Sequence, residues 1–202
     1  MRKILIAVFA TILFLGVTPN TQAQGFEKGK IYLDLGIGAP RYSYGVTGLG
    51  YGYYNHNTTR TPSFRTSVRY GFNEFISGGL YAGFTQHRWS YTNHQGFESF
   101  DRTQYIPVGV GASFHVWSFL NNTLDLGLGV ENLDLYVTLT TGAQIRAEVE
   151  KRPTYTNSDT RVSPFFGSMV GGRYFFLDWM GAYVQFGYGM NSYVEGGLTF
   201  KF

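Results

Sequence analysis

Cysteine is absent from this chain, and charged residues are scarce. Charged residues make up only 14% of its 202 residues, whereas about 25% is usual in globular domains. Without cysteine the chain can form no disulfide, no thiol-based active site and no cysteine-linked lipid anchor. Once Arg2 and Lys3 are set aside, 14 basic residues face 13 acidic ones, and no concentrated basic patch indicates a nucleic-acid partner.

Long apolar runs are also missing beyond the first residues. Hydrophobic residues make up 44% of the chain, yet the mean hydropathy is −0.12, because apolar and polar residues alternate. No segment after residue 23 offers the run of about 20 apolar residues that a transmembrane helix needs. Such alternation is typical of a β-barrel that has one face in lipid and the other turned inward.

The first residues predict a targeting segment. Arg2 and Lys3 give it a basic start, and residues 4–17 that follow are largely apolar. The sequence Thr21-Gln22-Ala23 then fits a cleavage site. This order is that of a secretory signal peptide. We therefore predict a signal peptide over residues 1–23 and a β-barrel domain over residues 24–202.

The last nine residues alternate strictly between two faces. One face carries Val194, Gly196, Leu198, Phe200 and Phe202, and the other carries Glu195, Gly197, Thr199 and Lys201. A tilted strand of about nine residues is long enough to cross a bilayer. Two readings fit this stretch alone: the last strand of a soluble sandwich, or the closing strand of a membrane barrel. The aromatic ending favours the closing strand.

The same alternation recurs along the chain and predicts eight strands. Their approximate ranges are residues 30–37, 63–72, 76–85, 102–116, 133–147, 164–176, 181–188 and 194–202. Residues 117–132 are ambiguous, because alternation there competes with leucines at four-residue spacing. A ninth strand would place the termini on opposite sides of the membrane, so we predict an elaborated turn with one or two helical turns.

Connections between these strands alternate between long and short. Residues 39–62, 87–101 and 148–161 are predicted as long polar loops, whereas residues 73–74 and 177–180 form tight turns. The last connection, residues 189–192, is short where a long one is expected. The predicted fold is an all-β, eight-stranded antiparallel up-and-down transmembrane β-barrel of a bacterial outer membrane, with both termini periplasmic.

Four motifs give the chain a resemblance to a known family. They are Gly71-Phe72-Asn73-Glu74-Phe75-Ile76-Ser77, Gly171-Gly172-Arg173-Tyr174-Phe175-Phe176, Gly187-Tyr188-Gly189 and Leu198-Thr199-Phe200-Lys201-Phe202. The mature chain thereby resembles the small outer-membrane β-barrels that include the OmpX-like proteins and the transmembrane domain of OmpA. This resemblance implies that Phe200 and Phe202 form a signal read by the barrel-assembly machinery. The long 117–132 connection and the short last loop depart from the family pattern.

Charged residues fall on the predicted inward face of the strands. They are Asp34, Arg65, Arg69, Asp134, Arg146, Arg173, Glu195 and Lys201, with Glu148 near the rim. An eight-stranded barrel has an interior that side chains can fill. Charges beneath a lipid shell must be paired or hydrated. We predict an internal polar network rather than a proton path or substrate tunnel, and therefore no general pore and no cofactor.

Other roles rest on residues in the predicted loops. A lipid-modifying enzyme at the barrel rim would use His87, Ser90, His94 and Glu98. A binding loop would use Tyr42, Tyr44, Tyr51, Tyr53 and Tyr54, although an aromatic girdle at the membrane surface explains the same residues. The four histidines, His56, His87, His94 and His115, show no metal-ligand spacing.

The favoured function is structural or surface-interacting, in an integral outer-membrane protein without enzymatic activity. An adhesion or partner-binding subunit of an outer-membrane complex is the alternative, and the rim enzyme comes third. The expected partners are outer-membrane lipid, the barrel-assembly machinery and a surface or periplasmic protein.

Overall fold

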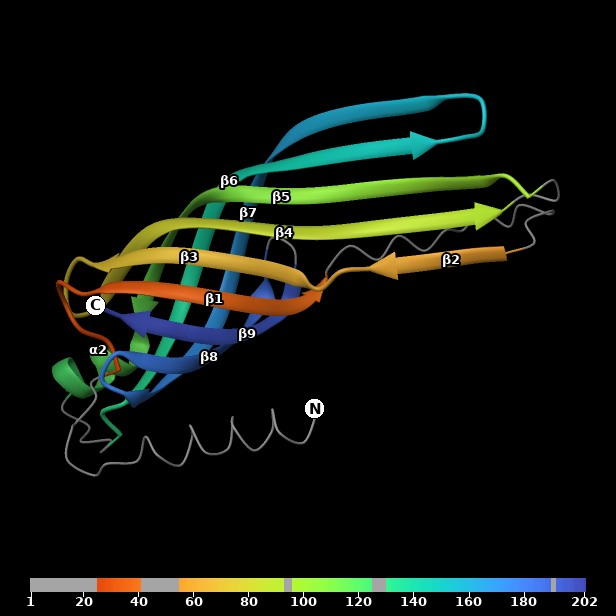
Figure 1. Cartoon of the computed structure of the whole chain (residues 1–202). Coiled ribbons are helices and arrows are strands. Elements are labelled where there is room, and N and C mark those ends of the chain that lie inside the picture. The colour runs from red at the N-terminus through yellow and green to blue at the C-terminus, as the bar shows by residue number, and fades with distance from the viewer. Residues whose placement is uncertain (1–24, 41–54, 93–95, 125–129, 190–191) are drawn as a thin grey trace, which may run out of the picture.

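Eight antiparallel strands close into a ring in the computed structural model, which describes residues 25–40, 55–92, 96–124, 130–189 and 192–202 (Figure 1). The ring strands are β1 (Ile31–Pro40), β3 (Ser63–Gly71), β4 (Ile76–Thr92), β5 (Glu98–His115), β6 (Leu133–Lys151), β7 (Thr156–Leu177), β8 (Met180–Tyr188) and β9 (Ser192–Lys201). Neighbours in sequence pair in turn, and β1 pairs with β9 to close the ring. The predicted eight-stranded antiparallel barrel is confirmed.

Period-2 alternation decides which way each side chain points. On β1, Ile31 and Leu35 are exposed on the outside, whereas Tyr32 and Asp34 between them are buried inside. The other ring strands repeat this arrangement, with mostly apolar side chains outward and mostly polar or aromatic side chains inward. Successive residues of a strand face opposite sides, so the sequence alternation becomes an apolar outer surface around a polar interior.

Glycines on the inner face make room for tyrosines. A Cβ on Gly36 would lie 2.0 Å from the Tyr183 hydroxyl, and one on Gly171 would lie 2.7 Å from the Tyr136 ring. Both tyrosines are buried in the barrel interior. The narrow lumen therefore pairs small residues on one strand with large residues on another.

A helix, α2 (Val116–Leu124), connects β5 to β6. The ring of Phe119 packs against Phe75 and Phe114 with centroids 5.6 and 5.7 Å apart, and the Trp117 indole donates a hydrogen bond to the Val130 carbonyl. The predicted helical turn is confirmed here, while residues 125–129 lie outside the described part. Across the described ranges, no helix combines the length and the apolar character needed to cross a membrane.

Two of the predicted long loops are wrong. Strand β4 runs on to Thr92 and β5 begins at Glu98, so most of residues 87–101 are strand. Likewise β6 ends at Lys151 and β7 begins at Thr156, which leaves a short turn within residues 148–161. Both faces of these segments carry polar residues, so they lack the apolar alternation by which strands are recognised in a sequence.

The third predicted loop, residues 39–62, is also partly wrong. Strand β2 (Asn55–Arg60) pairs with β4 from Asn55 opposite Thr92 to Arg60 opposite His87. It continues the line of β3 after a break at residues 61–62. Residues 41–54 lie outside the described part.

These additions form a sheet that projects beyond the ring on one side (Figure 1). We call it the extension; it comprises β2, residues 86–92 of β4, 98–104 of β5, 146–151 of β6, 156–161 of β7 and the turn 152–155 between the last two. Its inner face continues the lumen wall. Its outer face lies above the apolar outer surface of the ring and is itself largely polar.

Candidate functional site

The centre of the lumen holds a network of buried ion pairs. Asp34 on β1 pairs with Arg69 on β3, and the Arg173 guanidinium on β7 lies 3.5 Å from the same carboxylate. Arg173 also reaches Asp134 on β6, at 3.4 Å. All four residues are buried. Two acids and two arginines from four strands therefore neutralise one another where no water surrounds them.

Hydroxyl groups complete the surroundings of Asp34. The Ser67 hydroxyl donates to one carboxylate oxygen at 2.8 Å, and the Thr199 hydroxyl donates to the other at 2.7 Å. A buried carboxylate with hydrogen bonds to both oxygens is far less costly than a bare one. The network thus ties β1, β3 and β9 together at the seam where the ring closes.

A second cluster surrounds Glu195 on β9. The Tyr183 hydroxyl and the Gln185 amide donate to its carboxylate at 2.8 and 3.1 Å, and the Arg65 guanidinium lies 3.7 Å away. Beside Arg65 and Glu195 lies a cavity of only about 10 Å³, which is about the space of a single water molecule. Side chains therefore fill this part of the lumen.

The segment before β1 covers one end of the lumen. Phe26 stacks on the imidazole of His115 with ring centroids 3.4 Å apart. The Glu27 carboxylate pairs with Lys201, and the Gly25 amide donates to the Glu131 carbonyl at 2.6 Å. The segment thus binds the last strand and the β5–β6 connection at the end of the barrel that holds the short turns.

Three residues under this cover have the connectivity of a hydrolase triad. The Ser77 Oγ lies 2.8 Å from His115 Nε2, and His115 Nδ1 lies 2.8 Å from Asp134 Oδ1. Each of the three is at most 1% exposed, and Phe26 covers the imidazole. A substrate cannot reach Ser77 in this arrangement, so the chain of hydrogen bonds acts as a polar bridge across β4, β5 and β6. The alternation of the predicted strand 102–116 already pointed His115 inward, a signal that the sequence analysis missed.

Arg146 stands apart from the other predicted interior charges. It pairs with Glu148 on the inner face of the extension, and both side chains are about one-third exposed. The other seven predicted charges lie in the lumen, where they form the two clusters and the Lys201–Glu27 pair. The predicted set therefore divides between the ring and the extension.

The inner face of the extension carries paired charges near water. Arg152 lies 2.8 Å from both Asp101 and Glu150, and Arg161 lies 2.7 Å from Asp159. The hydrogen bond to Asp101 raises the pKa of the Arg152 guanidinium. The Arg152–Asp101 pair joins the β6–β7 hairpin to β5 above the level of the lumen, and the other two pairs lie within the hairpin.

The predicted rim-enzyme residues are not brought together. His87 and Ser90 lie on opposite faces of β4, because they are an odd number of positions apart on a strand. Burial and the neighbouring Arg60 lower the pKa of His87, and Glu98 pairs with Arg88. His94 and the five predicted binding tyrosines lie outside the described residues. Within the described ranges, no three His, Asp or Glu residues are placed to hold a metal ion.

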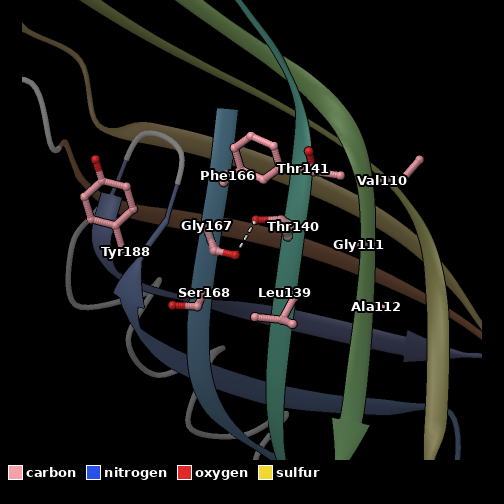
Figure 2. Close-up of a pocket in the computed structure, with 10 residues that line it drawn as sticks. All are labelled: Val110, Gly111, Ala112, Leu139, Thr140, Thr141, Phe166, Gly167, Ser168 and Tyr188. Carbon is pink, nitrogen blue, oxygen red and sulfur yellow. Dashed lines mark hydrogen bonds between the residues drawn. The ribbon is translucent and has the colours of Figure 1, made fainter. Parts of the chain in front are cut away.

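A shallow apolar groove of about 710 Å³ crosses the outside of β5, β6 and β7 (Figure 2). Small residues form its floor, and Leu139, Phe166 and Tyr188 are among the larger side chains around it. The Thr140 hydroxyl on β6 donates to the Gly167 carbonyl on β7 at 3.4 Å and links two of these strands. The groove belongs to the apolar outer surface and not to the lumen.

Residues 156–167 of β7, the part that enters the extension, have one unpaired edge. It pairs with β6 from Thr156 onward, whereas its pairing with β8 begins only at Ser168. Among the described residues, no strand pairs with the other edge of β7 over residues 156–167. Backbone N–H and C=O groups along that edge are therefore available for another strand.

Comparisons with known proteins found weak structural likeness alone. No family model and no curated protein matches the chain. The N-terminal β-barrel domain of Pseudomonas aeruginosa OprF is 12% identical, with a TM-score of 0.42 over 87% of this chain and 98% of that chain. Ail, the attachment invasion locus protein of Yersinia pestis, is 18% identical, with a TM-score of 0.45 over 87% of this chain and 100% of that chain. Values this low carry no argument about function.

Proposed function

We propose that this chain is a bacterial outer-membrane β-barrel with a filled lumen, and that its extension contacts other proteins outside the membrane. The observation that carries the membrane assignment is the inverted distribution of side chains. Leu80, Leu139 and Phe166 are 66%, 63% and 72% exposed on the outside, while Arg173 is 1% exposed inside. Water would disfavour so large an apolar surface, whereas lipid would cover it.

The height of the apolar surface fits a bilayer. Outward positions of β4 are apolar or small from Ile76 to Phe84, and those of β5 from Ile106 to Phe114. Nine residues of a strand tilted by about 40° span roughly 23 Å, close to the apolar band of about 25 Å that membrane barrels carry. Directly beyond them, the Gln86 and Gln104 side chains are hydrogen bonded at 2.9 Å on the outer face. We infer that the hydrocarbon layer ends below this glutamine pair.

The orientation follows from the two ends of the barrel. The start of β1 pairs with the end of β9, and this end also holds the short turns. With the extension outside the cell, both termini are periplasmic. The resemblance to small outer-membrane barrels implies that Phe200 and Phe202 contact the barrel-assembly machinery. The Phe200 ring stacks on Trp179 at 6.2 Å, and Phe202 is exposed. Cleavage of the signal peptide after residue 23 remains a prediction.

We infer a structural role for the lumen, because buried ion pairs and tyrosines fill it and leave no general pore. The free edge of β7 supports the second part of the proposal. A strand from a partner can add to such an edge by backbone hydrogen bonds. Pro164 lacks an N–H and limits the usable edge to residues 156–163. The rim-enzyme reading gains no support, since His87 and Ser90 face opposite sides.

Topology is tested by trypsin treatment of intact cells. Lys151 and Arg152 lie at the tip of the β6–β7 hairpin, so we expect cleavage there from outside. Protection of this site in intact cells, together with cleavage after the outer membrane is opened, would reverse the proposed orientation. Failure of the purified chain to insert into phosphatidylcholine vesicles would contradict the membrane assignment itself.

Partner binding is tested by the mass of the protein released from native outer membranes in mild detergent. Proline substitutions at Ser158 and Asp159 form a matched pair, because neighbouring residues of a strand aim their N–H groups at opposite edges. The proline that replaces the N–H pointing to the free edge blocks that edge and keeps the pairing with β6. The other proline removes a hydrogen bond to β6. We expect a defined assembly that this variant alone loses while its thermal stability is unchanged. A mass of one chain plus detergent for the wild type would leave only the structural role.

A further inference from the structure

The two faces of the extension differ in charge. Its inner face carries the acids Asp101, Glu148, Glu150 and Asp159, each paired with an arginine. Its outer face carries Arg88, Arg102 and Lys151, and among the described residues of that face Glu98 is the one acid. Both faces lie beyond the apolar surface, so contact with water does not explain the difference. What distinguishes the outer face is that it continues the surface that lipid covers.

Two of the outer cations oppose each other directly. Arg88 on β4 is the cross-strand partner of Arg102 on β5, and like charges in such a pair destabilise a sheet. Arg102 forms no ion pair with any described residue, and its Nε is buried without a hydrogen-bond partner. An anion between the two guanidinium groups would remove this repulsion by charge-assisted hydrogen bonds to their exposed N–H groups.

Two of the three cations lie against the ring of Phe100. The Arg88 guanidinium lies 4.4 Å from the centre of the Phe100 ring, and the Lys151 Nζ lies 5.8 Å from it. Glu98 is 3.5 Å from Arg88 and largely exposed, so it offsets one of three positive charges. The ring adds an apolar surface beside the cations.

The height of the site matches the lipid headgroups. Arg88 and Arg102 lie four residues beyond Phe84 and Ile106, the last apolar outward residues of their strands. Four residues of a tilted strand rise about 10 Å. The polar headgroup region extends about 5–7 Å beyond the hydrocarbon layer, and arginine and lysine side chains are long enough to reach back into it.

We propose that Arg88, Arg102 and Lys151 bind the phosphate of an anionic lipid in the outer leaflet, with Phe100 beneath its glycerol or sugar portion. Guanidinium groups bind phosphate oxygens in a bidentate manner. This inference rests on the proposed function, because only an inserted barrel brings these residues to headgroup height.

The test uses the full mature chain folded in a neutral maltoside detergent. Binding of dihexanoyl phosphatidic acid, dihexanoyl phosphatidylcholine and inorganic phosphate is measured by calorimetric titration. We expect phosphatidic acid to bind most tightly. The double variant Arg88→Gln/Arg102→Gln should weaken that binding about 30-fold, since each cation near an anionic lipid contributes roughly fivefold in affinity. Lys151→Gln, at an exposed position, should weaken it about fivefold and serves if the double variant does not fold.

Arg60→Gln is the matched control. Arg60 is the cross-strand partner of His87 and lies at the same height as Arg88, but on the inner face, so its removal should leave lipid binding unchanged. The site would be overturned if the wild type and the outer-face variants bound phosphatidic acid equally tightly. It would also be overturned if Arg60→Gln weakened binding as much as the outer-face variants do. Equally tight binding of inorganic phosphate would overturn the assignment to a lipid. If the chain inserts into phosphatidylcholine vesicles and yet shows no preference for phosphatidic acid, this inference fails while the proposed function stands.

Discussion

The ring and the extension use the same strands and the same antiparallel pairing, but they hold their charges differently. In the ring, Arg173 is 1% exposed and lies between two buried acids. In the extension, Arg152 is 21% exposed and also lies between two acids, at shorter distances. The shorter contacts do not imply the stronger effect, because water around Arg152 solvates the charges whether or not they are paired.

The outward-facing side chains of the ring and of the extension also differ, in their polarity. Around the ring the outward residues are mostly apolar, whereas in the extension they are mostly polar or basic, with a few apolar residues such as Phe100 and Val149 among them. One continuous ladder joins both regions along β4–β7. The surroundings, and not the strand pairing, therefore decide how much each side chain contributes. The variants below test this difference.

The largest effect is expected for Arg173→Met. The substitution leaves Asp134 and part of the Asp34 network without a counter-charge inside the barrel, and breaking a buried pair costs about 3–5 kcal/mol. Urea titration in neutral lipid vesicles gives the free energy of unfolding, and the difference between wild type and Arg173→Met measures this cost. An unchanged unfolding midpoint would show that Arg173 is not needed to neutralise the lumen acids.

The second largest effect is expected for a cation on the apolar outer surface of the ring. Leu139→Arg places a charge in the middle of the proposed hydrocarbon layer, at an expected cost of about 2–4 kcal/mol. Thr160→Arg is its control, since Thr160 faces outward on β7 but in the extension. Folding yield into phosphatidylcholine vesicles measures both. Equal yields would contradict the proposed position of the membrane.

A methyl group inside the lumen should have a smaller effect. In Gly171→Ala the new Cβ would lie 2.7 Å from the rigid Tyr136 ring, and overpacking of this kind costs about 1–3 kcal/mol. The neighbouring Gly172 faces outward, where a Cβ would meet the flexible end of Leu135 at 3.2 Å. Gly172→Ala should therefore be nearly neutral in the same urea titration. Equal losses for the two would mean that the lumen is not tightly packed.

The smallest effect is expected for Arg152→Met, the counterpart of Arg173→Met. Partly exposed ion pairs contribute about 0–1 kcal/mol, and salt screens them. We expect a shift near the limit of detection that decreases further at high salt. A loss as large as that of Arg173→Met would show that the extension, too, excludes water.

Prediction from the sequence succeeded where one face of a strand was apolar. The residues near Ile31, Leu80 and Leu139 show strict alternation, and there the predicted strands and their inward and outward faces match the structure. It failed beyond Gln86 and Arg146, where strands continue with water on both sides. A strand with two polar faces has no hydrophobic period, so its sequence resembles that of a loop.

The sequence by itself determined the barrel and its closing strand, because period-2 alternation assigns each side chain to one of two faces. It also determined which charges point inward. Tertiary structure alone decided how those charges pair, since Asp34 meets Arg69 and Arg173 only through strand register and the closure of the ring. It likewise placed Arg88 opposite Arg102 on the outer face of the extension. Such contacts join residues distant in sequence across strands, and no local pattern encodes them.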